Sequence, residues 1–163
     1  PQGLADGEYW SRVVISAKGG AVPITGADSG AIAIGLALEV RSIIPLLYRK
    51  GQLQTGIALT NLRAERVGDS LVVRARLDRT GGAAWIGTAR ATLVGAKGTT
   101  VGGFERPVAV YYGVEPSFTL PLPPEAAGSY RLRVELTSDR TDIPPELLLR
   151  APPVRDSVEV RLP

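Results

Sequence analysis

Residues 31–50 read AIAIGLALEVRSIIPLLYRK, and this stretch decides the fold. Its first half alternates strictly between large aliphatic residues and small ones. A period of two is the period of a β-strand, because successive side chains point to opposite faces of the pleat. One face therefore carries a row of large aliphatic side chains: Ile32, Ile34, Leu36, Leu38 and Val40. Pro45 has no N–H to donate, so the second half is expected to be an edge, a bend or a connector.

This strand has two interpretations. It is either a core strand of a β-sandwich or a strand that offers its aliphatic row to another polypeptide. Residues 8–17, before it, also alternate and are expected to form a strand. Gly residues and one Pro between the two segments predict a loop over residues 18–30, so that the two strands form a hairpin with a long connection.

Composition excludes several classes of function. The 163 residues are 44% hydrophobic, carry a net charge of +3, and include neither Cys nor His. Disulfides, thiolate metal sites and the commonest general base are therefore absent, and no carboxylate stands in a motif that pairs an acid with a base. We expect no enzyme, no metal and no cofactor. The arginines are spread along the chain, which argues against nucleic acid, and no apolar run is long enough for a membrane helix.

After Gly51 the chain shows seven alternating segments separated by turn signals. Gly-rich and Pro-rich turns recur roughly every ten to fifteen residues, and only 144–147 could form a helical turn. Trp85 shares its face with Ala89 and is expected in the core, whereas Trp10 shares its face with Arg12 and is expected to be partly exposed or at an interface. The pattern predicts an all-β protein with an immunoglobulin-like antiparallel β-sandwich. The expected strands are 53–62, 70–78, 83–94, 99–112, 117–122, 128–138 and 154–162.

A short repeat suggests how the chain is divided. Gly7-Glu8-Tyr9 and Gly128-Ser129-Tyr130 each follow a turn and open an alternating strand, and each is followed by a loop and one more alternating strand. In immunoglobulin-like sandwiches a Tyr near the start of the penultimate strand bonds back to the backbone. We therefore predict that residues 1–49 are the terminal hairpin of a first immunoglobulin-like domain and that 50–163 form a second domain. The chain is then a trimmed product or a piece of a longer protein.

The residues Gly7-Glu8-Tyr9, the loop after them and the long strand ending in Ile44-Pro45-Leu46-Leu47-Tyr48-Arg49 resemble the PapD-like periplasmic chaperones of pilus and fimbrial assembly. The similarity covers about residues 5–50 and concerns their divergent two-domain bacterial relatives. Two departures are visible. Trp10 stands where relatives often carry a basic residue, and the cleft arginine of the family's first strand has no counterpart here.

The resemblance implies a function in polypeptide binding. In these chaperones the last strand of the first domain donates alternating hydrophobic residues to a pilin subunit, which implies a partner-binding row of Ile32, Ile34, Leu36, Leu38 and Val40. Arg49 and Lys50 then lie near the interdomain cleft, and the protein is periplasmic or secreted. The expected partner is a pilin-like protein or peptide bound by strand addition, and self-association through 32–40 is a further expectation. The alternative is a structural or adhesive immunoglobulin-like module of a bacterial surface protein.

Overall fold

The structure is a computed structural model that describes residues 3–20, 22–23, 35–36 and 38–163. The described chain is built from antiparallel β-strands and one short 3-10 helix, η1 (Pro145–Leu147). It divides into two compact units, one formed by Lys50–Pro163 with the residues up to Glu8, the other by Tyr9–Arg49. No helix in these described ranges is long and apolar enough to cross a membrane.

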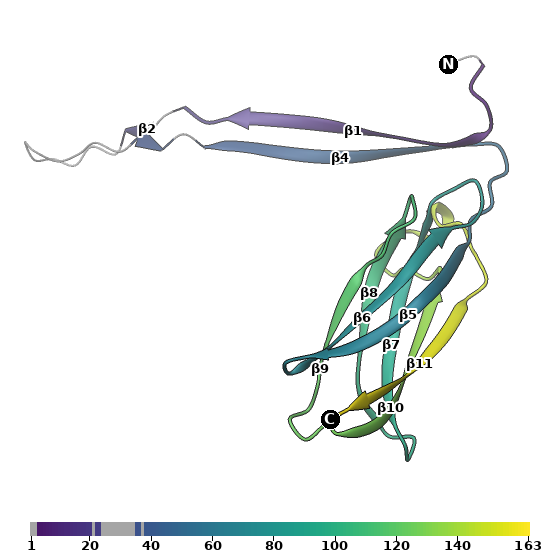
Figure 1. The fold of residues 1–163 in the computed structure, drawn as a ribbon. Helices are drawn as coiled ribbons and strands as arrows, with labels where there is room; N and C mark the ends of the chain where they lie inside the picture. Colours follow the sequence, from purple (N-terminus) through teal and green to yellow (C-terminus); the bar gives the residue numbers. More distant parts are fainter. Residues whose placement is uncertain (1–2, 21, 24–34, 37) are drawn as a thin grey trace, which may run out of the picture. The chain divides into compact units, whose positions relative to one another are not determined.

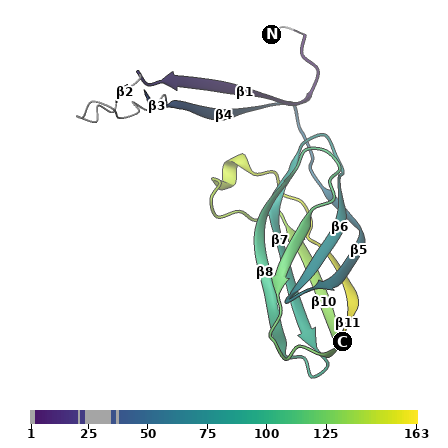
Figure 2. The same cartoon turned by 60° about the vertical axis from the view of Figure 1, so that its left-hand side comes forward.

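The larger unit contains seven strands in two antiparallel sheets (Figures 1 and 2). One sheet has the order β11-β10-β7-β8 and the other the order β5-β6-β9. The number of strands after Gly51 is the predicted one, and each overlaps a predicted segment. The strands are β5 (Ile57–Val67), β6 (Ser70–Arg79), β7 (Trp85–Gly95), β8 (Thr100–Val110), β9 (Ser117–Pro121), β10 (Gly128–Thr137) and β11 (Val154–Leu162).

Alternation along these strands builds a single core. In β6, Leu71, Val73, Ala75 and Leu77 are buried, and the residues between them are partly exposed. The buried residues of both sheets belong to one cluster, so the sheets cover each other's apolar faces. The rings of Phe104 in β8 and Phe118 in β9 stack with centroids 5.0 Å apart, joining the two sheets.

The first strand of the larger unit departs from its prediction. A strand was expected over 53–62, but β5 begins at Ile57 and continues to Val67. The pairing with β6 shifts between Thr60 and Arg63, and Asn61 has a φ of 54° in the left-handed region. This bulge adds one residue to β5, so the apolar positions are odd-numbered before it and even-numbered after it. A search for strict alternation therefore misses the second half of the strand.

The predicted helical turn at 144–147 is confirmed as η1. The repeat predicted that Tyr130 bonds back to the backbone, but its hydroxyl bonds to none of the described residues. Its ring is half-buried against the core and lies near Gly95. The structure therefore gives this side chain a packing role.

Residues up to Glu8 belong to the larger unit and form hydrogen bonds within it. Ala84 N donates a hydrogen bond of 2.8 Å to Glu8 Oε1, and Lys50 Nζ donates one to the carbonyl of Leu4. Gly51 has a φ of 80°, and the Asp6 side chain fills the place where a Cβ of residue 51 would stand. Because such a φ and such a contact both favour glycine, Gly51 marks the point where the chain leaves the hairpin.

The smaller unit is a hairpin. Strand β1 (Gly7–Lys18) pairs with β4 (Glu39–Lys50), and short β2 (Val22–Pro23) pairs with β3 (Gly35–Leu36). The strand predicted over 8–17 is confirmed. Of the long strand predicted over 31–49, β3 and β4 are described, and residues 31–34 and 37 lie outside the described residues. The predicted loop over 18–30 contains β2, and Pro45 lies inside β4 on a two-stranded ribbon, where each strand has an open edge.

The two tryptophans differ as predicted: Trp85 is fully buried, whereas Trp10 is 50% exposed with the Arg12 guanidinium 5.6 Å from its ring centroid. We expect Trp85→Ala to lower the free energy of unfolding by ~3–5 kcal/mol, because it empties the centre of the core. Trp10→Ala should cost far less. Urea denaturation measures both, and a larger loss of stability for Trp10→Ala would contradict this packing.

Candidate functional site

The hairpin of β1 and β4 is the candidate site because its large apolar side chains face solvent. Val40 is 52% exposed and Ile44 is 46% exposed, although both lie within a strand. The other exposed large apolar residues of the hairpin are Tyr9, Trp10, Val13, Val14, Ile15, Leu38, Ile43, Leu46, Leu47 and Tyr48. A contiguous apolar surface of this kind marks an interaction site in soluble proteins.

Three observations fix the register of the ribbon. Strands β1 and β4 each have 12 residues. Gly19 N donates a hydrogen bond of 2.9 Å to the carbonyl of Leu38 just beyond them. The rings of Tyr9 and Tyr48 lie 6.4 Å apart, as cross-strand neighbours on one face do. Regular antiparallel pairing between these points sets Tyr9 opposite Tyr48 and Val13 opposite Ile44.

This register gives the ribbon two unlike faces. One face, which we call the charge-free face, has only apolar and uncharged polar side chains up to Tyr48, and Lys50 of the same parity follows where β4 ends. It consists of Tyr9, Ser11, Val13, Ile15 and Ala17 from β1 with Val40, Ser42, Ile44, Leu46 and Tyr48 from β4. The other, the mixed face, adds charges to its apolar residues. It consists of Trp10, Arg12, Val14, Ser16 and Lys18 with Glu39, Arg41, Ile43, Pro45, Leu47 and Arg49.

The hydrogen-bonding pattern determines which backbone groups reach the open edge of β4. Residues opposite one another in an antiparallel pair alternate between those that bond each other and those whose N–H and C=O point away. Because Leu38 is in a bonded pair with Gly19, the even-numbered residues of β4 bond β1. The N–H groups of Arg41 and Ile43 therefore point to the open edge. The backbone nitrogen of Pro45 also points to the open edge. A proline fits there because β1 requires no N–H from that position.

The structure describes some of the predicted binding residues and not others. Ile32 and Ile34 lie outside the described residues, and Leu36 is placed in β3, paired with Val22. Leu38 is 63% exposed and Val40 is half-exposed, so the described end of the predicted row faces solvent. Arg49 and Lys50 are half-buried at the end of β4, but Lys50 belongs with the larger unit, where it bonds Leu4.

The sequence prediction missed the second half of the surface. Ile44 and Leu46 continue the even-numbered row along β4, one before and one after Pro45, and Val13 and Ile15 extend the same face onto β1. All four share one face with the predicted row once β1 and β4 are paired. The predicted row ended at Val40, where Ser42 interrupts the alternation of aliphatic residues.

Two ion pairs on the surface of the larger unit shift the pKa of a carboxyl group. Arg76 donates hydrogen bonds to Asp78, which lower the pKa of that carboxyl group, and Arg90 lowers the pKa of Glu105 in the same way. A general acid needs a raised carboxyl pKa, and these carboxylates are instead held as anions. Among the described residues there is no group of three or more acidic side chains that could hold a metal ion. No protein-family model matches the chain, and no curated protein matches it.

We expect the chain to self-associate through the charge-free face. Each aliphatic side chain there is about half exposed, and burying one fully is worth about 1.5–3 kcal/mol, so covering the row contributes several kcal/mol. Ile44→Asp combined with Leu46→Asp should make the protein monomeric in sedimentation velocity, because two carboxylates would be buried in the contact.

The matched control is Ile43→Asp combined with Leu47→Asp, which adds the same charge to the mixed face and should leave most of the association intact. Neither pair should change the melting of the larger unit. A wild-type protein that stays monomeric as its concentration rises would rule out association through this face.

Proposed function

We propose that this protein is a non-catalytic, chaperone-like module that binds an extended polypeptide by β-strand addition to the hairpin. The observation that carries the proposal is that β4 has both an open backbone edge and exposed aliphatic side chains. In strand addition, main-chain hydrogen bonds supply affinity and alternate side chains supply specificity. The strand β4 offers both.

Pro45 limits where an added strand can pair. An incoming strand needs the outward N–H groups of β4, and Arg41 and Ile43 provide them, whereas Pro45 has none. We therefore place the binding segment on the amino-terminal side of Pro45, which is where the predicted row of Leu38 and Val40 lies. Residues beyond Pro45 would contribute their side chains to the charge-free face.

The larger unit supports an immunoglobulin-like assignment. Its first, second and fifth strands share one sheet, and its third, sixth and seventh share the other, as in immunoglobulin-like sandwiches. Its fourth strand, β8, pairs with the third, which resembles the added strand of the variable type and differs from the constant type. Together with the resemblance of residues 5–50 to PapD-like chaperones, this arrangement favours a periplasmic or secreted protein that handles pilin-like subunits. We infer that the hairpin is the end of a further immunoglobulin-like domain.

The second candidate is a structural or adhesive module of a bacterial surface protein. One observation favours it: the charge-free face lacks any formal charge, as a surface packed permanently against another layer would. In that case the face is always covered and the open edge of β4 takes no client. The two candidates therefore differ in whether β4 exchanges partners.

A proline substitution tests strand addition without disturbing the hairpin. Arg41→Pro removes an outward N–H and leaves the bonds between β1 and β4, as Pro45 already does. The matched control, Arg41→Ala, also breaks the ion pair of 2.8 Å with Glu39 but keeps the N–H. We expect a fluorescent extended peptide of alternating Val and Thr to bind the wild type and Arg41→Ala in anisotropy titrations, and to bind Arg41→Pro about tenfold or more weakly.

The same peptide with its alternate amides N-methylated should fail to bind any of the three proteins, because it cannot form a ladder. Equal affinity of Arg41→Pro and Arg41→Ala, or undiminished binding of the N-methylated peptide, would show that the hairpin does not work by strand addition.

A further inference from the structure

The outer face of the four-stranded sheet is laid out in rows of cross-strand neighbours. In one row Glu105, Arg90, Glu135 and Arg155 alternate in sign across β8, β7, β10 and β11. Arg90 Nε lies 2.7 Å from Glu105 Oε2, and Arg155 Nη2 lies 2.5 Å from Glu135 Oε1. This row neutralises its own charge.

The adjacent row is different. Arg133 in β10 stands opposite Thr92 in β7 and Ser157 in β11, and Thr92 stands opposite Gly103 in β8. Both cross-strand neighbours of Arg133 therefore carry hydroxyl groups. Arg133 forms no ion pair within the described parts of the chain. One step further along β10, Arg131 Nη2 is paired with Glu159 Oε1 at 2.9 Å.

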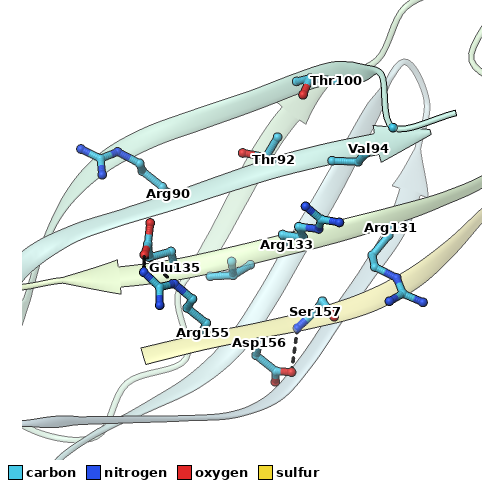
Figure 3. Close-up of a pocket in the computed structure, with 12 residues that line it drawn as sticks. Arg90, Thr92, Val94, Thr100, Arg131, Arg133, Glu135, Arg155, Asp156 and Ser157 are labelled. Carbon is cyan, nitrogen blue, oxygen red and sulfur yellow. Dashed lines mark hydrogen bonds and ion pairs between the residues drawn. The ribbon is translucent and has the colours of Figure 1, made fainter. Parts of the chain in front are cut away.

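These rows form a shallow depression in the sheet surface. Its lining combines the hydroxyl residues Thr92, Thr100 and Ser157 with charged residues of both signs, Asp156 among them (Figure 3). Arg133 projects from β10 beside Thr92 of β7 in this depression, with Arg131 and Arg155 to either side. A guanidinium with hydroxyl groups on both neighbouring strands presents several hydrogen-bond donors to a single anion.

We infer that this depression binds an oxyanion, a carboxylate or a phosphate, with Arg133 as the charged ligand-binding residue. A planar guanidinium donates two parallel hydrogen bonds to such a group, and Thr92 and Ser157 hydroxyls add single bonds. The paired arginines on either side contribute less, because Glu159 and Glu135 already compensate them. The site lies on the larger unit and stands independently of the function proposed for the hairpin.

NMR titration of the full chain tests the site. Acetate and phosphate are added separately at constant ionic strength, balanced with chloride, while the Arg133 Nε signal and the backbone amides of residues 92, 133 and 157 are followed. We expect saturable shifts with at least one of the two anions. Saturation by acetate identifies a carboxylate site, as for an acidic side chain of a partner, and saturation by phosphate alone identifies a phosphate site.

Two variants distinguish a specific anion-binding site from nonspecific attraction of anions to the positively charged surface. Arg133→Gln should weaken binding about tenfold or more, whereas Arg161→Gln, which removes an exposed arginine elsewhere on the same face, should leave it nearly unchanged. Chloride producing the same shifts, shifts that never saturate, or an equal loss in both variants would overturn the inference.

Discussion

A two-stranded ribbon cannot bury either of its faces by itself. Among the described residues, β1 and β4 have only each other as neighbours, so each keeps one open edge and the ribbon keeps two faces of side chains. A hairpin alone is marginally stable in water, and three strands or a second layer are ordinarily needed. The exposed apolar side chains of this hairpin fit the proposed packing on the charge-free face and the proposed pairing along the edge of β4.

The larger unit contrasts with the hairpin on the same physical grounds. Its sheets turn their apolar rows toward each other, so that Leu71, Trp85 and Leu132 lose all contact with solvent. Its charges remain on the outside, where some form cross-strand pairs such as Arg131 with Glu159. Such exposed pairs contribute little to stability, so burial of the core holds this unit together and leaves its outer face free to carry recognition chemistry.

Period-two alternation predicted most of the fold because it reports directly on which face of a strand is buried. It succeeded for β6, where alternation is uninterrupted, and it failed where the backbone departs from regular pairing. The bulge at Asn61 reversed the parity of β5 halfway along, so the second half of that strand was missed. Pro45 lies inside β4 at an edge, which is one of the settings expected for it. The row of Leu38 and Val40 was visible in the sequence, but its continuation in Ile44 and Val13 required the pairing of β1 with β4. Arg133 was indistinguishable from the paired arginines until the register placed hydroxyls beside it.

Amide hydrogen exchange along β4 tests the central claim most directly, because it reads the edge of the strand residue by residue. In dilute protein, where association is absent, the amides of Val40 and Ile44 should be protected by β1, and those of Arg41 and Ile43 should exchange as open amides. Protection of Arg41 and Ile43 should appear when the alternating peptide is added. If these two amides are already protected in the dilute protein, the edge of β4 is occupied by the chain itself, and binding by strand addition is contradicted.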